Sequence, residues 1–143
     1  MDKYKIIKSI ITSIRTSGDI ITVRETGRNL AKEVDFSNND QTFIATAISE
    51  IARNIIEYAQ TGEIQIDLVE KKRLYGIVIT SKDEGPGIPD IKMALMDGYS
   101  TGKGMGMGLP GARRLMDDFN ITSKVGVGTT VIMVKWKYSE GRE

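Results

Sequence analysis

A stripe of apolar residues at helical spacing, between about Asp40 and Gln60, constrains the fold of this chain most strongly. The residues that form the stripe recur every three or four positions, at Ile44, Ala47, Ile48, Ile51, Ile55 and Tyr58. This spacing predicts a long helix with one buried face. Such a helix must pack against a second layer of structure, because a single helix cannot bury its own apolar face.

The rest of the chain predicts a sheet that supplies this second layer. Alternating or β-branched apolar residues predict strands over about residues 6–15, 64–68, 74–80, 121–124 and 129–138. Helical spacing predicts further helices over about residues 20–34, 91–96 and 109–119. Ser17-Gly18-Asp19 is expected to form the turn and cap of the first helix, and Asn38 or Asn39 the cap of the second. This order predicts an α+β fold, a two-layer sandwich with helices on one face of a mixed, largely antiparallel sheet.

Length and charge predict one soluble domain. The 143 residues are expected to form a single unit, with residues 1–9 as an N-terminal extension and residues 139–143 as a frayed tail. The net charge of +1 does not favour binding to nucleic acid or to an anionic membrane. No apolar run is long enough to span a bilayer, and the N-terminus does not resemble a signal peptide. We therefore expect a cytoplasmic protein.

The sequence contains neither cysteine nor histidine. Their absence excludes a Ser-His-Asp triad, a zinc site of the usual kind and a histidine that accepts phosphate. Any general base must therefore be a carboxylate, a lysine or a tyrosine. Any catalytic metal must be bound through oxygen, which favours magnesium.

A glycine-rich run leads into the last expected helix. Six of the 15 glycines lie between Gly98 and Gly111, and four of them alternate at positions 102, 104, 106 and 108. Pro110 falls in the first turn of the helix, where its missing N–H is tolerated. Free backbone N–H groups and the helix dipole make such a loop suitable for a phosphate. A flexible linker explains the same residues equally well.

Three shorter motifs are weak when each is taken alone. Glu50 and Asn54 lie one helical turn apart at the edge of the apolar stripe, as a solvated helix flank also would. Asp83-x-Gly85-x-Gly87 follows an expected strand, and a simple turn accounts for it. Gly126-x-Gly128-Thr129 reads as a hairpin turn.

Taken in order, the four motifs resemble the Bergerat ATP-binding fold of DNA gyrase, Hsp90, histidine kinases and MutL, over about residues 10–137. The resemblance implies that Glu50 activates a water or hydroxyl and that Asn54 binds Mg²⁺. It implies that Asp83 binds the adenine amino group, with Gly85, Gly87 and Ile88 beside the base and Thr129 in the adenine pocket. The residues implied to surround the phosphates as a lid are Gly102, Lys103, Gly104, Met105, Gly106, Met107, Gly108 and Leu109.

Within this superfamily, the sequence is similar to small protein kinases. The segments 47–54, 83–91 and 97–117 resemble stressosome switch kinases of the RsbT type. That resemblance implies that ATP and Mg²⁺ are used to phosphorylate serine or threonine on STAS-domain proteins. It also implies a downstream effector, such as a stress-pathway phosphatase, and permits a homodimer.

Three other functions remain open from the sequence. An anti-sigma factor kinase of the same fold would bind a sigma subunit as its main task. A non-catalytic switch would bind nucleotide and a partner without transferring phosphate. A small ATP hydrolase is the third alternative. A basic face on the first helix, with Arg24, Arg28 and Lys32, is either a docking surface or an ordinary solvated face.

Overall fold

The structure of the chain is a computed structural model that describes residues 4–96 and 108–138. In these ranges the strands are β1 (Lys5–Ile14), β2 (Gly62–Lys71), β3 (Leu74–Asp83), β4 (Asp118–Lys124) and β5 (Gly128–Lys137). The helices are α1 (Ser17–Glu33), α2 (Asn38–Asn54), the π-helix η1 (Ile55–Ala59), α3 (Ile91–Ala94) and α4 (Gly108–Leu115). The expected frayed tail and most of the glycine run lie outside the described residues.

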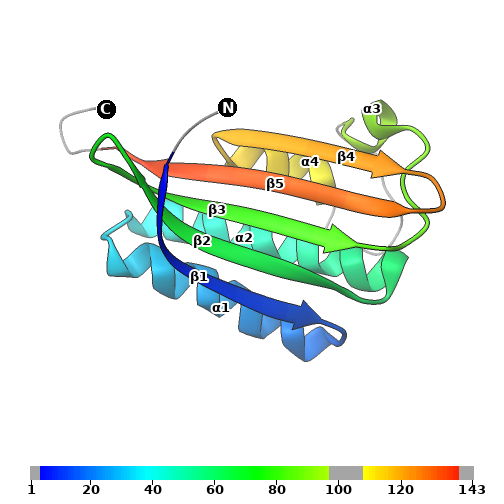
Figure 1. Ribbon diagram of the computed structural model, residues 1–143, viewed down its shortest axis with the longest axis horizontal. Helices are drawn as coiled ribbons and strands as arrows, with labels where there is room; N and C mark the ends of the chain where they lie inside the picture. Colours follow the sequence, from blue (N-terminus) through cyan, green and yellow to red (C-terminus); the bar gives the residue numbers. More distant parts are fainter. Residues whose placement is uncertain (1–3, 97–107, 139–143) are drawn as a thin grey trace.

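The described strands form one five-stranded sheet in the order β1-β2-β3-β5-β4, and every neighbouring pair is antiparallel. Helices α1, α2 and α4 lie on one face of this sheet (Figure 1). The expectation of an α+β fold with two layers is therefore confirmed. No helix in the described ranges is long and apolar enough to cross a membrane.

The core lies between the helices and the sheet. Isoleucines from α2 and from the central strands supply its largest fully buried side chains, among them Ile44, Ile48, Ile66 and Ile79. Gly27 of α1 allows that helix to approach α2 closely, because an added Cβ would lie 2.2 Å from Cδ1 of Ile48. Close packing of branched side chains between the helices and the sheet forms a rigid support for residues at the ends of the strands.

Three boundaries differ from the sequence-based expectation. The helix expected over residues 109–119 ends at Leu115, because the chain joins the sheet at once and Phe119 pairs with Met133. The first strand begins at Lys5, so most of the expected N-terminal extension belongs to β1. The cap of α2 is Ser37, whose Oγ accepts the backbone N–H of Asp40 at 3.1 Å, rather than Asn38 or Asn39.

The long central helix changes its geometry at Asn54. The α-helical pattern of α2 ends there, and η1 continues the chain as a single π-helical segment. A π-turn contains more residues than an α-turn, so side chains after it rotate away from the α-helical stripe. Tyr58, expected on the buried face, is therefore 44% exposed. Ile55, at the start of the segment, remains buried as expected.

Candidate functional site

A cavity of about 230 Å³ opens between the end of α2, the end of β3, the loop after β3 and the start of α4. Seven residues that the sequence motifs had singled out line it together, namely Asn54, Asp83, Gly87, Ile88, Gly108, Leu109 and Thr129. Their positions in the chain span 76 residues, from 54 to 129 inclusive. The fold thus brings parts of all four motifs to one place.

The polar wall of the cavity is formed by the ends of β3 and β5. Asp83 is the last residue of β3 and pairs with Thr129, the second residue of β5. Oδ1 of Asp83 accepts the backbone N–H of Gly85 at 2.8 Å, which fixes the rotation of the carboxylate. Ser81 lies two residues earlier on the same face of β3 and also lines the cavity. Sequence reasoning missed Ser81, although strand alternation from Asp83 would have found it.

The loop after β3 passes so close to its neighbours that its glycines are required. Gly87 has a φ of +80°, and an added Cβ would lie 2.4 Å from the backbone oxygen of Lys124. At Gly85 an added Cβ would lie 2.6 Å from Cβ of Ala59, in η1. Gly85 does not line the cavity but sets the distance between its loop and the helix wall. The two glycines therefore serve close packing and not only the turn.

Ser123 of β4 holds this loop in place, a role that no sequence motif indicated. Its Oγ accepts the backbone N–H of Ile88 at 2.7 Å and lies 2.7 Å from Oγ1 of Thr129. The N–H of Gly126 donates to the backbone oxygen of Pro86 at 2.9 Å. These contacts fasten the loop onto the turn between β4 and β5.

Glu50 is buried next to the cavity rather than at a solvated edge. The residue is 5% exposed, because α4 packs against α2 at this point. Its Oε1 accepts the backbone N–H of Gly108 at 3.0 Å, and its Oε2 accepts a hydrogen bond from Nη1 of Arg53 at 2.9 Å. The first of these contacts joins residues 58 positions apart. Glu50 thereby links the central helix to the first residue of α4.

Asn54 is the last residue of α2 and contributes to the helix wall of the cavity. Its amide oxygen is a ligand type that Mg²⁺ accepts, and this ion commonly takes only one or two protein ligands beside phosphate oxygens and water. Residues 4–96 and 108–138 contain no group of three or more acidic side chains that would hold a metal alone. The amide oxygen of Asn54 fits a magnesium ion whose other ligands are phosphate oxygens and water.

Six residues expected in the lid cannot be compared with the structure. Gly102, Lys103, Gly104, Met105, Gly106 and Met107 lie outside the described residues. The last two residues of the expected lid, Gly108 and Leu109, begin α4 and border the cavity.

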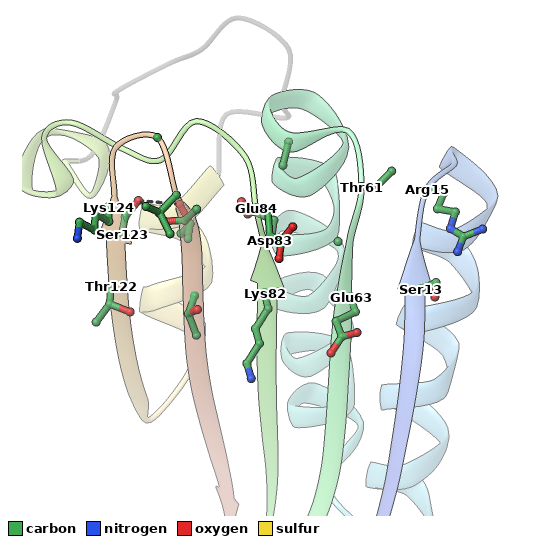
Figure 2. A pocket seen from close by; sticks show the side chains of 17 residues that line it. Ser13, Arg15, Thr61, Glu63, Lys82, Asp83, Glu84, Thr122, Ser123 and Lys124 are labelled. Atoms are coloured by element: carbon green, nitrogen blue, oxygen red, sulfur yellow. Dashed lines mark hydrogen bonds between the residues drawn. The ribbon is translucent and has the colours of Figure 1, made fainter.

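A second, wider depression of about 1270 Å³ lies on the face of the sheet turned away from the helices (Figure 2). Cations and anions alternate along it, as with Arg15, Lys82, Glu63 and Glu84. It is an open concave surface at the strand ends, and among residues 4–96 and 108–138 it shares Ala59, Asp83 and Thr129 with the cavity. Its mixed charges do not define a binding chemistry.

The comparison with known proteins assigns this arrangement to a family. Residues 39–140, more than half of the chain, match the family of histidine kinase-, DNA gyrase B- and HSP90-like ATPases. The chain belongs to this ATPase family. In solved structures, the RsbU and RsbW domains of Rv1364c from Mycobacterium tuberculosis share the fold, with a TM-score of 0.64 and 19% identity. That match covers 90% of this chain and 32% of the other.

Similarity to individual proteins narrows the assignment. The serine/threonine-protein kinase RsbT of Bacillus subtilis (strain 168) is 50% identical over 123 residues, which cover 86% of this chain and 92% of that protein. Within the ATPase family, the chain is thus a protein serine/threonine kinase of the RsbT type. The anti-sigma F factor of Geobacillus stearothermophilus is 32% identical over 111 residues, 72% of this chain and 74% of its own length.

Proposed function

We propose that the cavity binds ATP with Mg²⁺ and that the protein transfers the terminal phosphoryl group to a serine or threonine of a STAS-domain protein. The observation that carries this proposal is the convergence of seven motif residues on one cavity. The 50% identity with a serine/threonine-protein kinase supports the reaction type. As a partner-switching regulator, the protein would act in the cytoplasm and, once released, bind an effector such as a stress-pathway phosphatase.

The end of the cavity at Asp83 suits the adenine ring. The Asp83 carboxylate would accept a hydrogen bond from the exocyclic amine, in an orientation already fixed by the N–H of Gly85. Apolar residues beside it, including Ile55 and Val131, offer surfaces on which a flat ring can pack. Gly87 leaves the loop backbone without a side chain at this point. Together these features favour a purine over a sugar or an acyl group.

The opposite end of the cavity suits the phosphates. Asn54 would bind Mg²⁺, which neutralises phosphate charge when it is bound with ATP. Gly108 begins an eight-residue helix, and the positive end of the helix dipole favours an anion. In the transfer itself, the hydroxyl oxygen of the acceptor forms a bond to the terminal phosphorus while the bond to the ADP oxygen breaks. Glu50 would take the hydroxyl proton, since its carboxylate lies beside the cavity and contacts Gly108, which lines it.

Substitutions at two of these residues test the assignment. The protein is incubated with radiolabelled ATP, Mg²⁺ and a purified STAS-domain protein, and label on the STAS-domain protein is measured. Glu50→Gln is expected to reduce transfer by at least about 100-fold, as loss of a positioned acid–base group does. Asn54→Ala should also reduce transfer strongly, because it removes the proposed ligand of Mg²⁺. Lys92→Gln, at an exposed position of α3, provides a control that should keep the wild-type rate. A wild-type rate in either site variant would refute the assignment.

The similarity to anti-sigma F factors supports a second candidate, a kinase whose main partner is a sigma subunit. Binding affinities distinguish the two candidates. The protein with a bound ATP analogue is titrated separately with purified sigma factor and with purified STAS-domain protein. Tight binding to sigma factor would favour the anti-sigma function. Size-exclusion chromatography of the same samples would show whether a homodimer forms. Binding to the STAS-domain protein without any transfer of label would instead indicate a non-catalytic switch.

A further inference from the structure

We propose that Arg53 is a positioning residue, which together with the first residue of α4 holds the Glu50 carboxylate in the orientation needed for phosphoryl transfer. This inference rests on the proposed function, because it takes Glu50 as the group that accepts the hydroxyl proton.

The two carboxylate oxygens of Glu50 are held separately. Gly108 donates its backbone N–H to Oε1 at 3.0 Å, and Arg53 donates from Nη1 to Oε2 at 2.9 Å. One donor belongs to α4 and the other to α2, so two separate helices hold the carboxylate by hydrogen bonds. A carboxylate with one donor on each oxygen cannot rotate about its last bond without losing one of the contacts. The pair therefore fixes the plane of the carboxylate.

Neither Arg53 nor Glu50 is among the residues that line the cavity, and the two side chains contact each other beside it. Arg53 follows Glu50 by three residues and precedes Asn54 by one, so Arg53 and Asn54 leave the helix about 100° apart. Asn54 lines the cavity and Arg53 does not. The Arg53 side chain is 28% exposed, whereas that of Glu50 is 6% exposed. Arg53 consequently touches the carboxylate without bordering the space assigned to the nucleotide.

Burial of Glu50 makes the ion pair with Arg53 stronger than an exposed pair at the same helical spacing. Exposed ion pairs three or four residues apart on a helix contribute little, because water screens them. A charge-assisted hydrogen bond to a buried carboxylate is stronger, and its loss leaves a poorly solvated charge. Proton transfer also depends steeply on geometry, since a misplacement of about 1 Å can lower a rate by roughly 100-fold.

Two measurements on three variants test the proposal. Steady-state kinetics gives kcat, and calorimetric titration gives the dissociation constant of Mg·ATP. Arg53→Gln removes the charge but keeps an amide donor of shorter reach, and Arg53→Lys keeps the charge. Arg73→Gln is the matched control, since Arg73 is an exposed arginine in the turn between β2 and β3, at the sheet end away from Asp83. We expect Arg53→Gln to lower kcat between about 10-fold and 100-fold, with the dissociation constant of Mg·ATP within about twofold of wild type. Arg53→Lys should recover most of kcat, and Arg73→Gln should match wild type.

A double variant separates positioning from a general loss of structure. If Arg53 acts through Glu50, then adding Arg53→Gln to Glu50→Gln lowers kcat no further, because the two residues work as one unit. A further multiplicative loss, or a weaker affinity for Mg·ATP at unchanged kcat, would overturn the proposal. So would a wild-type kcat in Arg53→Gln alone.

A spectroscopic measurement keeps the test independent of activity. In the nitrogen–proton NMR spectrum, the Gly108 amide reports its hydrogen bond to Glu50 directly. We expect Arg53→Gln to shift this signal and Arg73→Gln to leave it in place. An unchanged signal in Arg53→Gln would refute the positioning role. Absence of phosphate transfer by the wild-type protein would instead refute the proposed function, so the two failures are distinguishable.

Discussion

Replacing Gly87 with alanine tests whether close packing of the loop after β3 holds the cavity together. An alanine with a φ near +80° carries a strain of about 1–2 kcal/mol. The added Cβ would also lie 2.4 Å from the backbone oxygen of Lys124 and 2.9 Å from Cα of Val125. These are backbone atoms and cannot rotate away, so the loop must move, which typically adds about 1–3 kcal/mol. We expect a total loss of about 2–5 kcal/mol in unfolding free energy, as the sum of these two effects.

The matched control is Gly126→Ala in the turn between β4 and β5. Gly126 has nearly the same φ, +82°, but an added Cβ would meet no atom within 4 Å. This variant should therefore lose only the strain of about 1–2 kcal/mol. The difference between the two variants isolates the contact between the loop and the turn.

Urea unfolding at equilibrium measures both variants, and calorimetric titration with Mg·ATP measures their nucleotide affinity. A displaced loop should weaken nucleotide binding in Gly87→Ala far more than in Gly126→Ala, because Gly87 lines the cavity and Gly126 does not. Equal losses of stability in the two variants would refute the argument. Wild-type nucleotide affinity in Gly87→Ala would show that the cavity does not depend on this packing.

Two further predictions concern charged groups outside the cavity. Lys135→Met should lower the unfolding free energy by about 1–3 kcal/mol in urea denaturation, because the ammonium group donates to the backbone oxygen of Leu115 at 3.0 Å and is mostly buried; an unchanged midpoint would contradict this role. The backbone N–H groups of Arg15 and Thr16 donate to the Asp19 carboxylate and lower its pKa in the folded protein. The ionised carboxylate therefore stabilises the fold fully above the unfolded-state pKa of about 3.9. This stabilisation is lost as the pH falls through the lower pKa of the folded state. The difference in stability between wild type and Asp19→Asn should therefore shrink below about pH 4, and a constant difference would refute it.

The sequence predicted the architecture well where structure depends on local pattern. The helix expected over residues 20–34 is α1, and its apolar face from Val23 to Ala31 is buried, while Ile20 and Val34 at its ends are partly buried. The helix–strand order and the packing of helices on one face follow from the same periodicities. Boundaries were less accurate wherever a contact distant in sequence decided them. Phe119 illustrates this, because its pairing with Met133 converts a helix-compatible segment into a strand.

The environment of Glu50 could not be read from its neighbours in the sequence. Helical geometry placed it at the edge of the apolar stripe, and the packing of α4 then covered it. The change at Asn54 from α- to π-helix likewise has no counterpart in the apolar spacing, and it turned Tyr58 outward. The role of Ser123 was not predicted, because a single serine in a strand does not indicate which group its hydroxyl will contact.

The sequence by itself identified seven of the residues that line the cavity, since the four motifs carry their residue types and order within short segments. The tertiary structure alone decided how those residues are held. Glu50 accepts a hydrogen bond from Gly108, 58 positions later in the chain. Gly87, in the loop after β3, packs against the backbone of Lys124 at the end of β4. Such contacts depend on how the layers pack. They involve backbone groups that become neighbours only after folding, so the local pattern of side chains does not predict them.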